Sequence, residues 1–275
     1  MKTILVPIDF SPAAENACNV AKVFAQKMHA TIHLAHFYTI PVADYSYPDI
    51  SMSAEIMEQT RKVALSSTEE TAKALRAEGY TVTTTVDTGL ASDEIVQLGE
   101  QIQADLIIMG TTGASGIINK LIGSNAAHVM QRTTRPILLL PVACNVSTMH
   151  KVVYLDELKE DDTRVLAQLF ALGDDLGFTA IRLLNINTGF FYQPIDAQLI
   201  AKIEAVFGSN KIKLENIDGI DVKEGIEHYL ENHKIDLIVM STHKKSFLER
   251  IFSKGDTYEM ALYSKIPLLV YHKQE

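Results

Sequence analysis

The sequence has no tryptophan and only two cysteines among its 275 residues. Cys18 and Cys144 lie far apart, and neither has a His or Cys neighbour at metal-ligand spacing. This pattern indicates neither a disulfide framework nor a zinc motif. We therefore expect two buried, reduced thiols, as is typical of a cytoplasmic protein.

An excess of basic residues is also missing. The chain has 25 Lys and Arg against 34 Asp and Glu, a formal net charge of −9. Such a charge repels nucleic acid and anionic membranes, so we expect neither as a partner. No apolar run approaches the roughly 18 residues that span a bilayer. The amino-terminal stretch "MKTILVPIDF" has no small-residue cleavage site and is typical of a first strand.

What the sequence does contain is a long-range repeat. "ADLIIMGTTG" near Asp105 returns as "IDLIVMSTHK" near Asp236, 131 residues later. "TRPILLLPV" returns as "SKIPLLVYH" with the same offset, and "KTILVPID" resembles "HKVVYLD" with one residue fewer. The repeat predicts two copies of one domain, residues 1–143 and 148–275.

Each copy alternates apolar strands with amphipathic helices. In the first copy we predict strands at 3–8, 31–37, 81–89, 105–110 and 136–142, and helices at 12–28, 53–78, 91–103 and 125–132. In the second we predict strands at 151–155, 180–187, 212–217, 236–240 and 266–271, and helices at 161–176, 196–207 and 222–233.

This alternation predicts the α/β class. We expect two tandem Rossmann-like or flavodoxin-like domains, each a five-stranded parallel sheet with helices on both faces. We also expect them to be related by a pseudo-two-fold axis. In such sheets ligands bind beyond the carboxyl ends of the strands, where the strand order reverses.

A glycine-rich string follows the fourth strand at that edge. Gly110, Gly113 and Gly123-Ser124 form a G-x2-G-x9-G-S pattern. Glycine permits positive φ and close approach of a phosphate to the backbone, and a helix that starts at Ser124 would offer free N–H groups to an anion. The alternative interpretation is that these glycines only turn the chain and cap the helix.

The first copy resembles the ATP-binding members of the universal stress protein family. The resemblance rests on "VPIDFS" at the end of the first strand, "HLAHFY" at the second, and the complete glycine string. With the degenerate second copy it covers nearly the whole chain, so the sequence resembles a tandem universal stress protein.

The resemblance implies a cofactor-binding site for ATP, with Mg²⁺ or Mn²⁺ and without protein ligands to the metal. Asp9 would contact the nucleoside, and the backbone around Phe37 would meet the adenine edge. Asp9 has a compatible second interpretation, as a carboxylate bonded to its own turn. The site residues implied are Pro7, Ile8, Asp9, Phe37, Met109, Gly110, Thr112, Gly113, Gly123, Ser124 and Asn125. In the family, fifth strands often pair at domain or subunit contacts, here 137–142 beside 268–272, which leaves a homodimer open.

The expected role is that of a nucleotide-sensing module in a stress response, and no catalytic residue is assigned. The sequence lacks G-x-x-x-x-G-K-[ST], and no G-x-G-x-x-G follows the first strand. Lys120 is the one basic residue inside the glycine loop. Two alternatives stay open: a slow ATPase or phosphate- or adenylate-transferring enzyme, and a scaffold or carrier of another small ligand.

The second copy departs from the glycine pattern. At an offset of 131 residues, Ser241 replaces Gly110, Lys244 replaces Gly113 and Lys254 replaces Gly123. Asp156 persists at the end of the first strand of this copy, and we expect Lys244 to fill the crevice and pair with it. A less favoured alternative is a cationic pocket of Thr242, His243, Lys244 and Lys254 for a different anion.

Overall fold

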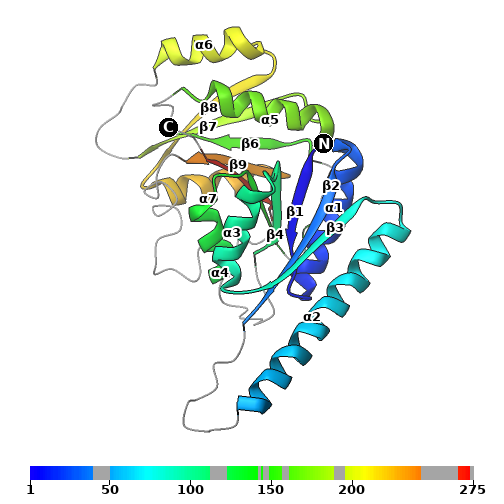
Figure 1. The fold of residues 1–275 in the computed structure, drawn as a ribbon. Coiled ribbons are helices and arrows are strands. Elements are labelled where there is room, and N and C mark those ends of the chain that lie inside the picture. Colours follow the sequence, from blue (N-terminus) through cyan, green and yellow to red (C-terminus); the bar gives the residue numbers. More distant parts are fainter. Residues whose placement is uncertain are drawn as a thin grey trace.

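One continuous sheet runs through the whole molecule. The computed structural model describes residues 1–39, 50–111, 123–141, 144, 149–156, 161–188, 196–242 and 266–272. Within them, ten strands are hydrogen-bonded in the order β3-β2-β1-β4-β5-β10-β9-β6-β7-β8 (Figure 1). From either edge to the centre, the strands of each half follow in the same order: its third, second, first, fourth and fifth strand. The pseudo-two-fold repeat predicts this order.

The elements of the first half follow the predicted order. They are β1 (Thr3–Pro7), α1 (Pro12–Met28), β2 (Thr31–Tyr38), α2 (Ile50–Ala77), β3 (Val82–Thr88), α3 (Ala91–Gln101), β4 (Leu106–Gly110), α4 (Ser124–Arg132) and β5 (Ile137–Leu140). The second half adds β6 (Val152–Leu155), α5 (Thr163–Leu176), β7 (Ile181–Thr188), α6 (Ala197–Phe207), β8 (Ile212–Gly219), α7 (Val222–Asn232), β9 (Leu237–Thr242) and β10 (Leu268–His272). The predicted elements are confirmed, with ends displaced by at most three residues.

The two halves meet at their fifth strands. Every pairing within a half is parallel, whereas β10 pairs with β5 in the antiparallel direction. Leu268 lies opposite Leu139, and Val270 lies opposite Ile137. All four side chains are buried. The predicted contact between the fifth strands is confirmed, and it makes the two half-sheets one.

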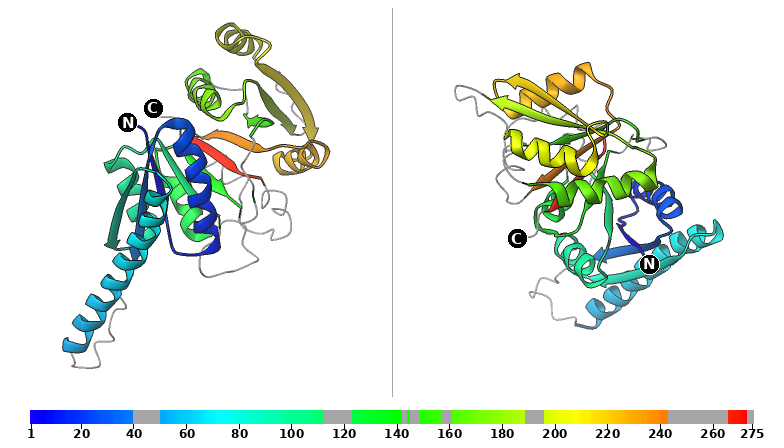
Figure 2. Two further views of the ribbon diagram at one scale, coloured as in Figure 1. Left: turned by 90° about the vertical axis from the view of Figure 1, so that its right-hand side faces the viewer. Right: turned by 90° about the horizontal axis from the view of Figure 1, so that it is seen from above.

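Helices cover both faces of the sheet (Figure 2). Buried residues of α1, α2, α5 and α6 form a core on one face, and those of α3, α4 and α7 form a core on the other. Each core continues across the junction between the halves. Polar contacts also cross it, since Lys2 Nζ lies 2.7 Å from Asp175 Oδ2 and Lys27 Nζ donates to the carbonyl of Leu176.

The start of α1 follows directly from its sequence. The Ser11 hydroxyl accepts a hydrogen bond from the Ala14 N–H at 3.2 Å, and Pro12 occupies the first turn, where no N–H is needed. The helix therefore begins immediately after the end of β1 and its Asp9. This places the first turn of α1 at the carboxyl edge of the sheet.

Helix α2 is longer than the strands that it covers. Its 28 residues span about 42 Å, whereas the eight residues of β2 span about 26 Å. Its buried side chains are Ala64, Thr68, Ala72 and Leu75, and none of residues 54–63 is buried. Both views show its amino-terminal end projecting beyond the sheet (Figures 1 and 2). Among the described residues no helix is long and apolar enough to cross a membrane.

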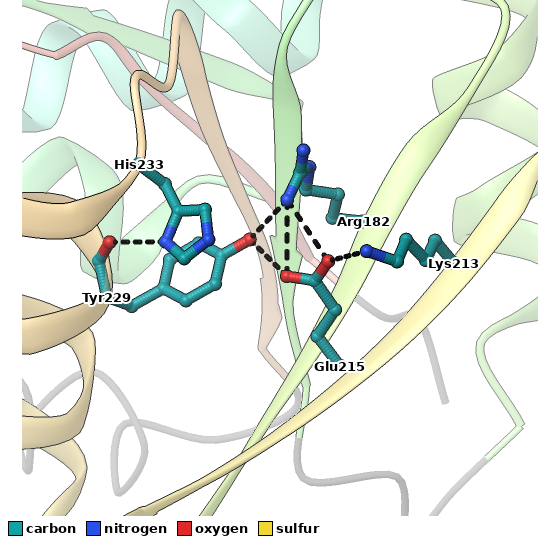
Figure 3. Close-up of polar contacts among 5 residues, drawn as sticks. All are labelled: Arg182, Lys213, Glu215, Tyr229 and His233. Carbon is teal, nitrogen blue, oxygen red and sulfur yellow. Dashed lines mark hydrogen bonds and ion pairs between the residues drawn. The ribbon is translucent and has the colours of Figure 1, made fainter.

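A polar network fastens α7 to the sheet of the second half (Figure 3). The Tyr229 hydroxyl donates to Glu215 Oε2 at 2.5 Å, and Arg182 Nη1 lies 3.1 Å from Glu215 Oε1. Lys213 Nζ lies 2.7 Å from the same Oε1. Burial opposes ionisation of Glu215, but the bonds from Lys213 and Tyr229 and the charge of Arg182 prevail and lower its pKa. Burial and the bond to Glu215 raise the pKa of Tyr229 to about 12.

We predict that Tyr229→Phe lowers the free energy of unfolding by about 2 kcal/mol at pH 7, because the half-buried Glu215 carboxylate loses one charge-assisted hydrogen bond. The tyrosine pKa is raised in the folded state from 10.0 to about 12. Its contribution is therefore complete below pH 10 and is lost as the pH rises towards 12. Urea unfolding at pH 7, 9, 10 and 11 tests this. A difference between the two proteins that stays constant up to pH 11 would contradict the assignment.

Candidate functional site

A pocket lies at the carboxyl ends of β1 and β4. These neighbouring strands stand where the order of the first half reverses, since β2 follows on one side and β5 on the other. The pocket has a volume of about 300 Å³. It is lined by Pro7, Ile8, Asp9, Ser11, Ala14, Ala35, Phe37, Ala91, Ile95, Met109, Gly110, Thr111, Gly123, Ser124, Asn125 and Ala126. The pocket thus joins the ends of three strands to the first turns of three helices.

Nine of the eleven predicted site residues line this one pocket. They come from the ends of β1, β2 and β4 and from the start of α4, segments up to more than a hundred residues apart. Thr112 and Gly113, the other two, lie outside the described residues. The structure therefore brings together the predicted residues that it describes.

Asp9 follows β1 and forms part of the pocket wall. Its Oδ1 accepts a hydrogen bond from the Ser11 N–H at 3.1 Å. This is the bond to its own turn that the second interpretation of Asp9 predicts. The bond holds the carboxylate at the entrance to α1, within the lining of the pocket.

The amino terminus of α4 opens on the same pocket. Gly123 is the N-cap, with extended backbone at φ −61° and ψ 156°, and it provides no side-chain cap to the first turn. Its own N–H donates to the carbonyl of Thr111, at the end of β4. The N–H groups of a helix's first turn and the helix dipole favour an anion at such a position.

The structure corrects the reason for glycine at position 110. The described glycines with positive φ are Gly79, Gly89, Gly177 and Gly208, so the turn at Gly110 does not require that conformation. A Cβ on Gly110 would stand 2.6 Å from the Ala13 Cβ and 3.0 Å from the Ala13 backbone. Gly110 is therefore needed because α1 packs directly on the end of β4.

Seven lining residues were missed by the sequence analysis: Ser11, Ala14, Ala35, Ala91, Ile95, Thr111 and Ala126. Several are alanines, whose small side chains make room for a ligand but carry no recognisable motif. One signal was available. Ala35 stands two residues before Phe37 and so faces the same side of β2.

Metal-ligating clusters are missing from the described part of the chain, where no group of three or more His, Cys, Asp and Glu side chains is placed to hold an ion. The two histidines of β2 have other contacts. The His33 ring contacts the hydroxyls of Thr83 and Thr85, and burial lowers its pKa. His36 Nδ1 lies 2.8 Å from the carbonyl of Ile8.

Asp156 directly follows β6, as predicted, and strand register shows which residue of the first half it corresponds to. Ile4 pairs with Leu106 in the first half, as Val152 pairs with Leu237 in the second. Counting four residues along β1 and β6 puts Asp156 at the position of Ile8, one before that of Asp9. The one-residue deletion in "HKVVYLD" therefore places the carboxylate one residue nearer to the strand than Asp9 is.

Larger side chains occupy the equivalent place in the second half. By the same register Leu184 replaces Ala35 and Ser241 replaces Gly110. Val222, the first residue of α7, stands in place of Ala91, the first residue of α3. The Ser241 hydroxyl donates to Asp162 Oδ2 at 2.7 Å, and the buried Tyr154 hydroxyl donates to the same oxygen. Burial, reinforced by the charge of Asp162, raises the pKa of Tyr154.

These larger side chains and their contacts stand where small residues line the pocket in the first half. The predicted pairing of Lys244 with Asp156 and the alternative cationic pocket rest on residues 243, 244 and 254, outside the described residues.

The doubly wound sheet, with its pocket at the reversal of strand order, defines a protein of the doubly wound α/β type. A sequence model of the universal stress protein family matches residues 1–141, about half of the chain. The protein belongs to the universal stress protein family.

Related proteins agree with this assignment. A universal stress protein of Methanocaldococcus jannaschii is 32% identical over 145 residues, which cover 50% of this chain and 81% of that relative. One from Thermus aquaticus is also 32% identical over 145 residues, or 50% of this chain and 98% of the relative. A solved universal stress protein of Archaeoglobus fulgidus matches with a TM-score of 0.70 at 17% identity, covering 99% of this chain and 98% of that one. The fold of both halves together is therefore shared.

We predict that Gly110→Ala lowers the free energy of unfolding by about 1–3 kcal/mol, because its methyl group would force α1 away from β4. Adding Ala13→Gly should recover part of this loss, since the Ala13 Cβ is the nearest obstacle. Thermal and urea unfolding of the single and double variants measure both effects. An unchanged stability of Gly110→Ala would show that the approach of α1 is not constraining.

Proposed function

We propose that the protein binds one ATP per chain in the pocket of the first half. The observation that carries this proposal is the shared wall of that pocket: the Asp9 carboxylate after β1 and the uncapped start of α4 at Gly123 both contribute to it. A carboxylate suits ribose hydroxyls, and free helix N–H groups suit phosphate oxygens.

The remaining lining suits an adenine ring. Ile95 and Met109 provide apolar surface, and the alanines at positions 35 and 91 leave room beside them. The backbone near Phe37 would meet the edge of the base. Mg²⁺ or Mn²⁺ would enter with the phosphates, because Mg²⁺ commonly keeps several waters and binds through phosphate oxygens. We include Thr112 and Gly113 in the proposed site with the nine lining residues named above.

The second half would not hold a nucleotide in this proposal. Leu184, Val222 and Ser241 take the space that Ala35, Ala91 and Gly110 leave open in the first half. We propose domains at residues 1–143 and 148–275, a cytoplasmic location and a nucleotide-sensing role in a stress response. ATP at about a thousandfold above its dissociation constant would add ~4 kcal/mol to the stability of the binding conformation. That gain is large enough to shift a conformational equilibrium.

Binding is favoured over catalysis by the composition of the described lining. Asp9 is its single Asp, Glu, Lys, Arg, His or Cys residue, so no described lysine or second acid stands ready for phosphoryl transfer. Slow hydrolysis remains the second candidate. It is tested by following phosphate release from the Mg²⁺·ATP complex.

We predict that calorimetry with Mg²⁺·ATP gives one site per chain. Asp9→Asn should weaken binding about tenfold, because the ribose loses a charged acceptor. Gly123→Val should weaken it at least as much, since its side chain would occupy the turn at the phosphates. Both variants keep allowed backbone geometry.

Asp196→Asn is the matched control. Asp196 caps α6 in the second half by accepting from the N–H groups of Gln198 and Leu199, and asparagine caps as well. It should leave ATP affinity unchanged. Absence of binding to the native protein, or equal affinity of all four proteins, would refute the proposed site.

A further inference from the structure

Helix α4 connects the proposed phosphate site to the second half of the chain. Its nine residues span about 13 Å, with Ser124 at the pocket and Arg132 at the far end. A helix this short is not stable alone, so its position depends on what holds it. Contacts along the side and at the carboxyl end of α4 therefore fix the N–H groups that face the pocket.

The side of α4 is fixed within the first half. Asp93, in the first turn of α3, accepts at one oxygen from Arg132 Nη1 at 2.9 Å, and His128 Nε2 lies 2.9 Å from the same oxygen. Ala126, Val129 and Met130 are buried in the core beneath. These contacts hold α4 against α3 and the sheet.

The carboxyl end of α4 is fixed from the second half. His272, the last residue of β10, places its ring Nε2 2.7 Å from the carbonyl oxygen of Met130. Because a carbonyl can only accept, Nε2 carries the proton and donates. Met130 is within the last four residues of the helix, whose carbonyls have no intrahelical partner. His272 thus caps α4 from the other half of the molecule.

The surroundings of His272 keep this bond sheltered. Burial of the His272 ring lowers its pKa. The backbone groups of Met130 and Arg135 and the charge of Glu100 favour the charged ring, but their effect is smaller than that of burial. Glu100 in turn accepts from Arg135 Nε at 3.0 Å and from the Thr134 N–H at 3.1 Å. The connection between α4 and β5 is therefore held on several sides.

We propose that the second half supports the phosphate-binding helix of the first, and that His272 is the positioning residue through which it does so. The inference rests on the proposed binding of ATP. Without the donor, the buried carbonyl of Met130 is left unpaired, and fraying or displacement of α4 relieves this. If only a fraction of the molecules then hold the α4 amino terminus in place, the apparent dissociation constant for ATP equals the intrinsic constant divided by that fraction.

The test separates the phosphates from the nucleoside. His272→Leu should weaken Mg²⁺·ATP binding roughly three- to tenfold, which corresponds to 10–30% of molecules in the competent state. Adenosine affinity should stay unchanged, because adenosine has no phosphates to contact α4. His272→Gln should bind ATP within about twofold of the native protein, since the glutamine amide can place an N–H near the former Nε2.

The control is Tyr229→Phe, which loosens the second half at the network of Figure 3 without touching α4. It should bind both ligands as the native protein does. The inference is overturned if His272→Leu leaves ATP affinity unchanged, if it weakens ATP and adenosine equally, or if His272→Gln is as impaired as His272→Leu. The native protein is measured first. If it binds no ATP, the proposed function fails and this inference fails with it, an outcome distinct from the other three.

Discussion

The antiparallel pairing of β5 with β10 is the constraint on which the arrangement of the molecule depends. Each half-sheet would otherwise end in a strand with unpaired backbone groups beside buried leucines. Pairing Leu138 and Leu139 with Leu269 and Leu268 satisfies those groups and joins the hydrophobic cores on both faces. The two copies therefore form one sheet and two continuous cores, held in a single relative orientation.

The two copies differ at the carboxyl edge of their half-sheets. In the first, small residues such as Ala35 and Ala91 keep a pocket open at the switch in strand order. In the second, Leu184 and Ser241 occupy the corresponding positions, and Asp162 satisfies the hydroxyls of Ser241 and Tyr154. Through the pairing of β5 with β10, each copy also covers the fifth strand of the other.

Most of the fold was predictable because the relevant signals are local. Apolar runs such as "DLIIMG" specify buried parallel strands, and Ser11-Pro12 specifies a helix start. The repeat predicted two copies of one domain, and the family resemblance predicted the contact between the fifth strands. The site residues at strand ends were also predictable, since parallel strands bring their carboxyl ends to one edge.

The features that the sequence did not predict depend on contacts between residues far apart in the chain. The need for glycine at position 110 comes from Ala13, almost a hundred residues away in the chain, and not from a local turn. The sequence shows that "HKVVYLD" is one residue shorter, but the pairing of β6 with β9 is needed to place Asp156 at the position of Ile8. The contact of His272 with Met130 joins residues that no motif links.

The reversal of chain direction at the β5–β10 junction also determines how the molecule faces its surroundings. The carboxyl ends of the parallel strands point in different directions in the two halves. The two halves therefore cannot close over one shared ligand as the lobes of a clamshell would. The outer edge strands, β3 and β8, lie farthest from the junction, at the two opposite flanks of the one sheet.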